Sequence, residues 1–395
     1  MKPNSSFFSF VAGVVLSVTA SSSYLYAAEK APVVKTIDIG TAAPAFKLKG
    51  VDDKEYSLQS FKEAKYLVVI FTCNHCPDAR ASWGRINQFT KDYAEKGVQV
   101  VAISSNSPKA LMLWENGYSV FGDSFPEMKE LAAERKLTFP YLYDGDTQEV
   151  ALAYGAMATP HTFIFGPERK LLYQGQFDNG QRNPGPAKKN TVKDAVDNLL
   201  AGKPVEKTKT RIFGCSTKWA YKQDWVVKKQ KEWDALPVSV EPVTVDQVKE
   251  LVTNKTGKIR VINVWSTSCG PCIAEFPELI DTYRRYQQRP FDMITISIDP
   301  KDDADKVENF LVKQHLPTSP RGKKAMEKEG RKTNNYHYQS EDLDALAEAL
   351  DTEWQGPIPH TLVIDAEGKI LFRHNGQVDV VELRKAIVKG IEGLK

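Results

Sequence analysis

The five cysteines of this 395-residue chain are the residues best suited to chemistry. Four of them form two C-x-x-C pairs, Cys73-Asn-His-Cys76 and Cys269-Gly-Pro-Cys272, and Cys215 is left over. A disulfide framework in an exported protein would have more cysteines, spread more widely. Two close pairs in a long chain instead indicate local redox chemistry. One thiolate attacks a substrate disulfide, and its partner thiol then resolves the mixed disulfide.

Each pair is expected to lie where a buried strand turns into a helix. Residues 66–71 and 260–265 are mostly apolar, as buried strands are. After each pair, apolar residues recur every three or four positions: Trp83, Ile86, Phe89 and Tyr93 after the first, and Ile273, Phe276, Leu279, Ile280 and Tyr283 after the second. A helix N-terminus stabilises a thiolate and can lower a cysteine pKa from about 8.5 to about 3.5–7.5. We therefore expect Cys73 and Cys269, which we place nearer the helix dipole, to attack.

Zinc binding is the main alternative for paired cysteines. Four-cysteine zinc ribbons separate their pairs by about 15–20 residues. Here Cys76 and Cys269 are 193 positions apart, and each pair has its own strand and helix. We expect no metal and no cofactor.

Two later segments show that the pattern occurs twice. Residues 158–165 and 357–364 both contain Pro-His-Thr at the start of an apolar strand, and each is followed by a polar turn and a second apolar strand. The distance from Cys73 to Pro160 is 87 positions, and that from Cys269 to Pro359 is 90. Strand, C-x-x-C, helix and proline-led strand repeat in one order, which indicates a duplicated domain.

Both halves resemble thioredoxin-fold domains. The resemblance implies an α/β protein with two thioredoxin-like domains, each a central mixed β-sheet flanked by helices. It also implies that Pro160 after Thr159 and Pro359 after Ile358 are cis-prolines that face the C-x-x-C pairs. The residue before such a proline can hydrogen-bond to an extended substrate, so these four residues are expected to shape the substrate grooves.

The domain organisation follows from the extent of the resemblance. We expect a signal peptide over residues 1–28, a first thioredoxin-like domain of the redoxin kind over 37–203, and a second thioredoxin-like domain over 241–395. Residues 204–240 are expected to form a basic, tryptophan-containing connector that carries Cys215.

The two halves resemble different branches of the fold. Residues 43–46 (Ala-Pro-Ala-Phe) and 100–104 (Val-Val-Ala-Ile-Ser) resemble the redoxin branch, which includes alkyl hydroperoxide reductases and thiol-specific antioxidants. Peroxiredoxins of that branch use P-x-x-x-T-x-x-C, whereas here Ile70 stands three positions before Cys73. Residues 265–277 resemble extracytoplasmic thiol-disulfide oxidoreductases of the cytochrome c maturation type.

Four further residues are candidates for supporting roles. Glu275 matches a glutamate that helps proton transfer in the second family; the alternative is a surface residue of a helix. His75 could stabilise the Cys73 thiolate and make the first site more oxidising than the second; the alternative is an exposed histidine without effect. His161 and His360 could reach the active-site face, but we favour partly buried strand histidines.

Cys215 and the connector have open interpretations. Cys215 could be a third redox thiol that receives a disulfide from Cys73 and Cys76, or an inert small residue packed under the first domain. Residues 203–232 hold nine Lys/Arg against three Asp/Glu. We favour a connector whose tryptophans pack on the domains over a nucleic-acid or lipid patch. The polar segment 319–332 is expected to be an inserted loop.

The composition and the N-terminal sequence limit the class of protein and its cellular compartment. Hydrophobic residues make up 42% and charged residues 26% of the chain, which suits folded domains. The net charge of +3 gives no case for nucleic-acid binding. Lys2, the apolar segment 7–18 and the small-residue exit at Tyr26-Ala-Ala28 predict a secretory signal peptide and an exported, periplasmic or otherwise extracytoplasmic protein. The alternative is an uncleaved tether.

These observations predict an extracytoplasmic thiol-disulfide oxidoreductase that exchanges disulfides with protein cysteines through both C-x-x-C sites. Its partners would be protein thiols and disulfides and an upstream thiol electron donor, which could be membrane-bound. Two alternatives remain open. One is a thiol-dependent peroxidase, and the other is a non-catalytic protein that binds copper or apo-cytochrome segments through its thiolates.

Overall fold

The structure is a computed structural model that describes residues 33–394. The predicted signal peptide, and its alternative as an uncleaved tether, lie outside the described residues. Within 33–394, no helix has the length and apolar character to cross a membrane. The described chain contains a seven-stranded sheet, a six-stranded sheet and a small two-stranded sheet.

The first domain is built on the seven-stranded sheet, whose strand order is β2-β1-β5-β4-β3-β7-β8. Its strands are β1 (Lys47–Gly50), β2 (Glu55–Ser57), β3 (Tyr66–Thr72), β4 (Val98–Ser104), β5 (Tyr141–Tyr143), β7 (His161–Phe165) and β8 (Leu171–Gly175). Its helices are α1 (Pro77–Tyr93), α2 (Phe125–Arg135), α3 (Glu149–Tyr154) and α4 (Thr191–Leu200). Strands β3, β4 and β5 run parallel to one another. Strand β7 pairs antiparallel with β3 on one side and with β8 on the other.

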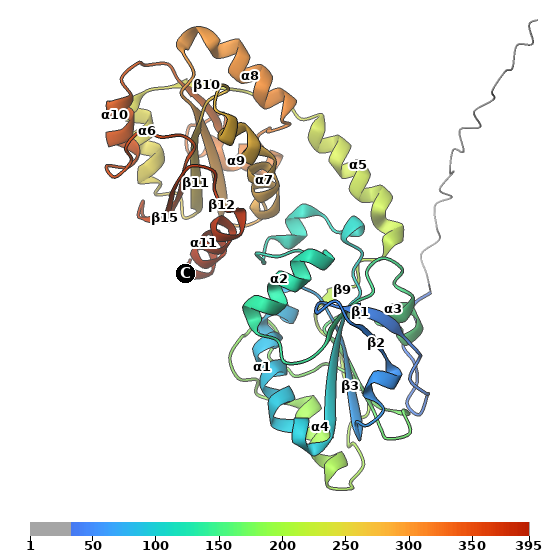
Figure 1. Ribbon diagram of the computed structural model, residues 1–395. Coiled ribbons are helices and arrows are strands. Elements are labelled where there is room, and N and C mark those ends of the chain that lie inside the picture. The colour runs from blue at the N-terminus through green and yellow to red at the C-terminus, as the bar shows by residue number, and fades with distance from the viewer. Residues whose placement is uncertain (1–32, 395) are drawn as a thin grey trace, which may run out of the picture. The chain divides into compact units, whose positions relative to one another are not determined.

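Both faces of this sheet are covered (Figure 1). Every residue of β3 is buried, and because side chains alternate across a strand, each face receives a different set. Val68 and Ile70 pack in one cluster with Trp83 of α1 and Val196 of α4. Leu67, Val69 and Phe71 pack in another cluster with Tyr154 of α3. Strand β3, which ends one residue before Cys73, is therefore fixed from both sides.

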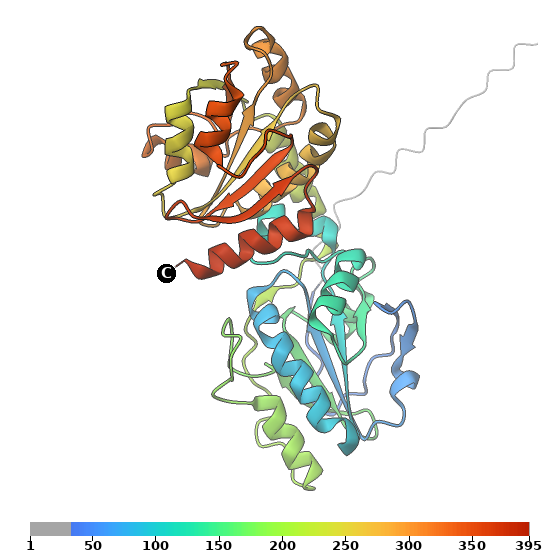
Figure 2. The same cartoon turned by 60° about the vertical axis from the view of Figure 1, so that its left-hand side comes forward.

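The second domain is built on the six-stranded sheet, in the order β10-β13-β12-β11-β14-β15. Its strands are β10 (Glu241–Val243), β11 (Ile259–Trp265), β12 (Phe291–Ser297), β13 (Asn335–Tyr338), β14 (His360–Ile364) and β15 (Ile370–Asn375). Its helices are α6 (Val245–Thr253), α7 (Gly270–Tyr286), α8 (Ala304–Lys313), α9 (Pro320–Glu327), α10 (Leu343–Leu350) and α11 (Val380–Gly393). Its sheet also lies between two layers of helices (Figure 2).

The predicted fold class is confirmed, because each sheet is mixed and flanked by helices. The predicted strands 66–71 and 260–265 are β3 and β11, and the helices that follow are α1 and α7. One expectation is wrong. Segment 319–332 contains helix α9, whose first turn is capped by Ser319 Oγ accepting from Gly322 N at 3.0 Å. A serine before a proline is a common helix start, so this segment begins with a helix where the sequence pattern predicts a loop.

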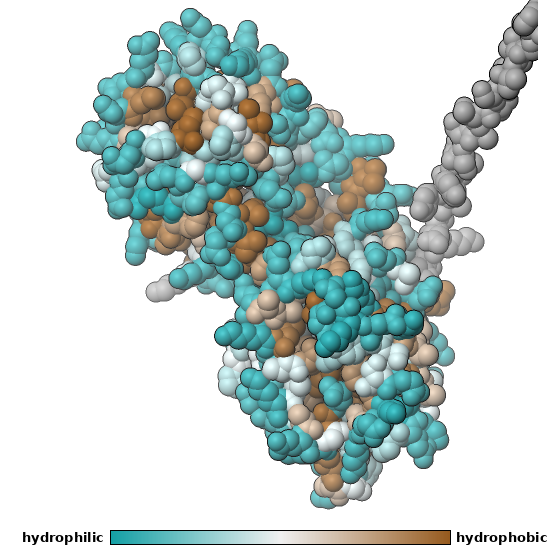
Figure 3. Space-filling view, in the orientation of Figure 1, coloured by the Kyte–Doolittle hydropathy of each residue, from teal (hydrophilic) through white to brown (hydrophobic). Residues whose placement is uncertain are grey.

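The connector holds β9 (Cys215–Ser216) and α5 (Gln223–Asp234). Two of its tryptophans are buried: Trp219 joins a core cluster of the first domain, and Trp233 packs against Tyr283 with ring centroids 5.9 Å apart. Trp225 on α5 is 51% exposed. Figure 3 shows hydrophilic residues over most of the visible face, with apolar residues in small separate groups.

Candidate functional site

The first C-x-x-C pair lies between β3 and α1, as predicted, but its helix begins later than expected. Helix α1 starts at Pro77, and Cys76 is its N-cap residue. The helix dipole therefore favours a thiolate on Cys76 rather than on Cys73, and our expectation for the first site is wrong in this respect. Both side chains are fully buried, with 0% exposure.

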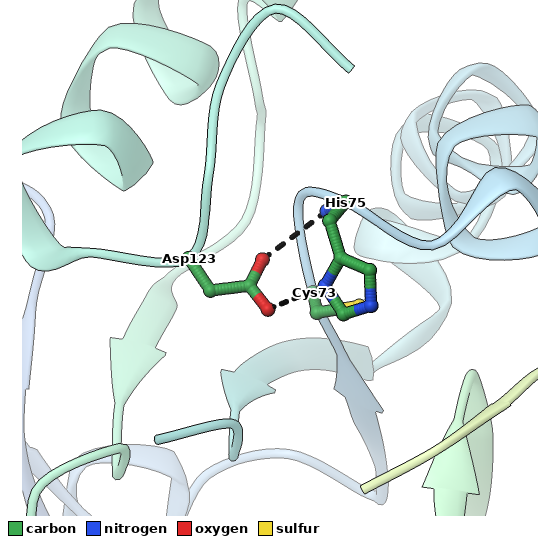
Figure 4. A group of neighbouring side chains, drawn as sticks. All are labelled: Cys73, His75 and Asp123. Carbon is green, nitrogen blue, oxygen red and sulfur yellow. Dashed lines mark hydrogen bonds and ion pairs between the residues drawn. The ribbon is translucent and has the colours of Figure 1, made fainter. Parts of the chain in front are cut away.

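Pro77 explains why the helix starts late, because a residue before a proline is disfavoured in the helical conformation and Cys76 is extended, with φ −66° and ψ 125°. Asp123 holds the turn that precedes the helix. Its Oδ1 atom accepts hydrogen bonds from the backbone N–H groups of Asn74 at 2.8 Å and His75 at 3.1 Å. Its Oδ2 atom accepts from Asn106 Nδ2 at 2.8 Å and lies 2.6 Å from His75 Nδ1. These bonds hold the two residues between the cysteines outside the helix. Figure 4 shows the contacts of Asp123 with His75.

His75 is a buried partner of Asp123, so the alternative of an exposed histidine is wrong. Its side chain is 2% exposed. Burial works against a charged ring, but the charge of Asp123 and its hydrogen bond outweigh this and raise the pKa of His75. The same pair holds the pKa of Asp123 below its usual value despite its burial. His75 Nε2 is buried without a hydrogen-bond partner.

In the reduced protein, the pKa values of the two thiols of the first site are shifted in opposite directions. Burial, together with the Cys76 sulfur, raises the pKa of Cys73. Hydrogen bonds from the Cys215 and Cys73 thiols, together with backbone N–H groups, lower the pKa of Cys76 despite its burial. Of the two thiols, Cys76 is therefore the one that ionises more readily.

The predicted cis-prolines are present and face the cysteines. The peptide bonds Thr159–Pro160 and Ile358–Pro359 are both cis. Cys73 Sγ lies 3.1 Å from Thr159 Oγ1, and Cys76, as a thiol, donates to the Thr159 carbonyl oxygen at 3.2 Å. The residue before Pro160 therefore contacts both sulfurs of the first site.

The second pair has a more open setting. Cys269 and Cys272 form a disulfide, and Cys269 is the N-cap residue of α7, as expected. Its Sγ atom lies 3.8 Å from the Ile358 carbonyl oxygen. Cys269 is partly exposed, whereas Cys272 is fully buried. This difference in access suits an attacking and a resolving sulfur.

Glu275 lies one turn beyond Cys272 on α7. Its side chain is 2% exposed, so the alternative of a surface residue is wrong. Its Oε1 atom accepts from Asn263 Nδ2 and its Oε2 atom from Val378 N, both at 2.9 Å. Burial raises the pKa of Glu275, and these two hydrogen bonds oppose the rise. A buried carboxyl with a raised pKa can accept a proton near neutral pH.

Sequence reasoning missed three polar partners of the two sites. Asp123 serves the first site. At the second, Asp299 accepts from Thr267 N at 2.9 Å, so it holds the turn before the cysteines, and Asn263 orients Glu275. Asp123 and Asp299 are distant in sequence from the cysteines, and the fold brings them close. Asn263 lies only six positions before Cys269, on β11, but no motif marks it.

The histidines after the cis-prolines are buried strand residues, as we favoured. His161 has 0% exposure, its Nε2 atom lies 3.3 Å from Gln174 Oε1, and burial lowers its pKa to about 4. His360 also has 0% exposure, and its Nδ1 atom lies 2.7 Å from Asn375 Oδ1. Both rings are held by neighbours on the next strand.

A metal could be considered only where donor atoms converge. Donor atoms of Cys73, His75 and Asp123 lie within 4.8 Å of one another. The shortest contact in this group is the hydrogen bond between His75 Nδ1 and Asp123 Oδ2. A metal held by both atoms would have to replace that hydrogen bond, so the arrangement favours an ion pair.

Comparison with known proteins agrees with the geometry. Residues 39–174 match the AhpC/TSA family, and residues 234–387 match the Redoxin family. Strand, C-x-x-C, helix and cis-proline define the thioredoxin class of fold, and they occur here twice. The chain therefore contains two redoxin/AhpC-TSA domains of the thioredoxin fold in tandem.

Several named relatives are thiol-disulfide proteins. The chain is 28% identical over 133 residues to the thiol-disulfide oxidoreductase ResA of Bacillus thuringiensis, which is 34% of this chain and 64% of that one. It is 27% identical over 155 residues to the thiol:disulfide interchange protein HelX of Rhodobacter capsulatus, which is 39% of this chain and 73% of that one. The chain thus spans less than two thirds of the Bacillus relative.

Solved structures with a similar fold include a hypothetical protein of Sinorhizobium meliloti. It is 35% identical, the match covers 47% of this chain and 97% of that one, and the TM-score is 0.41. A putative thiol:disulfide interchange protein DsbE of Chlorobium tepidum is 20% identical, with 42% and 98% of the two chains covered and a TM-score of 0.32.

The ion pair of His75 and Asp123 predicts a pH-dependent stability. The raised pKa of His75 makes its contribution complete below about pH 6.5, and the contribution is lost as pH rises through the raised value. The lowered pKa of Asp123 means that its contribution to stability is complete above about pH 4, and this contribution is lost as the pH falls through the lowered value. The stability difference between wild type and His75→Gln should therefore be largest between about pH 4 and 6.5. Chemical denaturation over a pH series measures it, and a constant difference up to pH 9 would contradict the ion pair.

Proposed function

We propose that this chain is an extracytoplasmic thiol-disulfide oxidoreductase that exchanges disulfides with protein cysteines at both C-x-x-C sites. One observation carries the proposal: in each domain a sulfur at a helix N-terminus lies beside the carbonyl group that precedes a cis-proline. In the second domain that carbonyl can bind an extended substrate next to the reacting sulfur, whereas in the first domain β9 of the chain itself pairs with this edge. The similarity to ResA and HelX, a thiol-disulfide oxidoreductase and a thiol:disulfide interchange protein, supports the same reaction class.

The second site is the better placed for a protein substrate. Gly270 and Pro271 between its cysteines are exposed, and Ile273 beside them is 38% exposed. An exposed apolar residue beside a reactive sulfur can contact a substrate protein. We propose protein thiols and disulfides as substrates and a thiol protein as the upstream donor. The basic connector serves as a link whose buried tryptophans fix it to the domains.

Export rests on the N-terminal sequence and on the reaction class. Lys2, the apolar segment 7–18 and the alanine exit have the order of a secretory signal, and disulfide exchange suits an oxidising compartment. Fractionation of cells that express the full chain tests this. Recovery of an uncleaved chain in the cytoplasm would contradict it.

Insulin reduction tests the reaction. With dithiothreitol as the electron source, the full chain should accelerate cleavage of insulin disulfides. A variant in which Cys73, Cys76, Cys269 and Cys272 are all serine should not. Equal rates for the two proteins would refute the exchange function.

A thiol-dependent peroxidase is the second candidate, because the first domain matches the AhpC/TSA family. The peroxidase motif is absent around Cys73, where Ile70 occupies the position of its threonine. Consumption of hydrogen peroxide by the reduced chain, lost in Cys73→Ser, would favour this candidate over disulfide exchange.

The two sites should differ in reduction potential. Hydrogen bonds that lower the pKa of Cys76 stabilise the reduced form of the first site, and a stabilised reduced form is more oxidising. The Gly-Pro pair of the second site is typical of reducing thioredoxins, so potentials of about −180 against −270 mV mark the expected poles. Electrons would then pass from the second site to the first. Titration of each site, with the other removed by serine substitution, measures the difference, and equal potentials would refute it.

A further inference from the structure

The first site is covered by a strand of the connector. Strand β9 pairs antiparallel with β6 (Ala158–Thr159), with Cys215 opposite Thr159 and Ser216 opposite Ala158. Thr217 N continues the pairing by donating to the Met157 carbonyl at 3.1 Å. This is the backbone edge that precedes the cis-proline. The chain's own segment therefore lies where an extended substrate would add a strand.

Gly214 allows the close approach. Its φ is +138°, and a Cβ atom at this position would lie 1.9 Å from the Thr159 carbonyl oxygen. A side chain could be accommodated only if the segment moved away from the proline loop. Glycine has no such restriction, so this residue lets the connector lie directly over the groove.

The covering segment, which we call the connector strand (residues 208–219), is fastened at both ends. Before the groove, Gln174 N on β8 donates to the Thr208 carbonyl at 2.9 Å. After it, Lys218 N donates to Asn106 Oδ1 at 2.8 Å, and Trp219 is 8% exposed in the core. The connector strand is thus an integral part of the first domain rather than a loose link.

The connector strand brings a third sulfur to the pair. Cys215 N donates to Cys76 Sγ at 3.4 Å. The Cys215 side chain is partly buried and packs against the buried cluster of Cys73, Cys76 and Ala79. Cys73 and Cys76 have 0% exposure, whereas Cys215 is partly exposed. In this conformation a substrate protein can reach the first site only through Cys215.

We propose that Cys215 is the relay thiol of the first site: it exchanges disulfides with Cys76 inside the chain and with protein substrates outside it. This inference rests on the proposed function and names the residue that meets the substrate. Of the two sequence interpretations of Cys215, the geometry supports the redox thiol. The inert packing residue does not explain a strand that places a sulfur between the buried pair and solvent.

The relay balances as two exchanges. When Cys73 and Cys76 are joined, the Cys215 thiolate attacks Cys76 Sγ, the Cys76–Cys215 bond forms, and Cys73 leaves as a thiolate. A substrate dithiol then attacks the Cys215 sulfur, and Cys76 leaves as a thiolate. The second substrate thiol displaces Cys215. The substrate has lost two electrons and two protons, and the first site has gained them. The same steps in reverse reduce a substrate disulfide.

The state of Cys215 changes with that of its partner. In the reduced protein, hydrogen bonding to the Cys76 sulfur and burial raise the pKa of Cys215. Once Cys76 is in a disulfide it no longer carries the charge that holds this proton. Cys215 is then freer to ionise and attack, so oxidation of the pair itself prepares the relay thiol.

Cross-linking tests the contact. Full-length Cys73→Ser, which retains Cys76 and Cys215, should form a Cys76–Cys215 disulfide under mild oxidation, identified by peptide mapping in a mass spectrometer. The matched variant Cys76→Ser, which retains Cys73 and Cys215, should form far less of a Cys73–Cys215 disulfide. If Cys76 and Cys215 both stay free to alkylation in the first variant, or if the two variants link equally, the relay is refuted.

Kinetics test the relay itself. In a full-length background with Cys269→Ser and Cys272→Ser, Cys215→Ser should slow exchange with a protein dithiol by at least about tenfold, because an intramolecular thiol has a high effective concentration. The control is Ser216→Ala, because Ser216 is an exposed neighbour on the same strand. This variant should exchange at the rate of the parent background. If the Cys215→Ser rate equals that of the control, the relay fails although exchange stands. If the parent background exchanges nothing, the proposed function fails at this site together with the relay.

Discussion

Replacing Cys272 by serine should convert the second site into a trap for its substrates. Cys269 keeps its place at the N-terminus of α7 and its partial exposure, so it can still attack a substrate disulfide. The buried sulfur that would resolve the mixed disulfide is gone. Turnover at this site should fall by about a hundredfold or more, and the variant should accumulate covalent adducts. Gel electrophoresis without reductant, followed by mass spectrometry, identifies the trapped proteins.

The matched variant is Cys269→Ser, which leaves Cys272 as the only sulfur of the site. Because Cys272 has 0% exposure, a folded substrate protein should not reach it. Both variants remove the same disulfide and should lose similar stability, so a difference in adducts reports access rather than folding. Adducts of equal yield in the two variants would refute the assignment of Cys269 as the attacking sulfur.

Trapping variants should also behave differently in the two domains. At the first site both C-x-x-C sulfurs are buried beneath the connector strand, so the corresponding variants should trap few protein substrates unless Cys215 takes part. The second site has an exposed Gly-Pro pair and needs no such intermediary. The two domains would thus offer a cysteine sulfur to substrates in different ways: through Cys215 of the connector at the first site, and directly through Cys269 at the second.

The local part of this architecture could be predicted from the sequence. Apolar strands such as 66–71 and the helical periodicity after each pair are encoded within about twenty residues, and the structure places them as β3 and α1. The cis-prolines followed from a resemblance that depends on order along the chain rather than on distance. These features need no knowledge of how distant segments meet.

What the sequence could not provide depends on contacts between distant segments. Asp123 lies 48 positions after His75 in a segment without any motif, yet it holds the backbone of both residues between the cysteines. The pairing of Cys215 with Thr159 joins a connector residue to a strand 56 positions earlier. A two-residue strand in a basic segment has no periodicity from which to infer it.

Glu275→Gln should slow resolution at the second site by about a hundredfold, within the range of general acid–base catalysis. Resolution requires that Cys272 lose its proton, and a fully buried thiol cannot pass it directly to bulk water. Glu275 lies one helical turn away, and burial raises its pKa above the usual value. Its ionised form can take the proton, so the wild-type rate should fall as pH drops through this raised pKa. The variant should lack that fall, as single-turnover kinetics over a pH series would show.

Structural damage must be separated from lost proton transfer. The carboxylate accepts from both Asn263 Nδ2 and Val378 N, whereas a glutamine has one acceptor oxygen and leaves one buried donor unpaired, at a cost of about 1–3 kcal/mol. A stability loss alone lowers the rate at every pH and leaves the profile unchanged. Glu278→Gln, at a position whose side chain is 58% exposed on the same helix, should alter neither the rate nor the profile. If Glu275→Gln keeps the wild-type pH profile, the carboxyl is a packing group that positions α7, and the proton must leave Cys272 by another route.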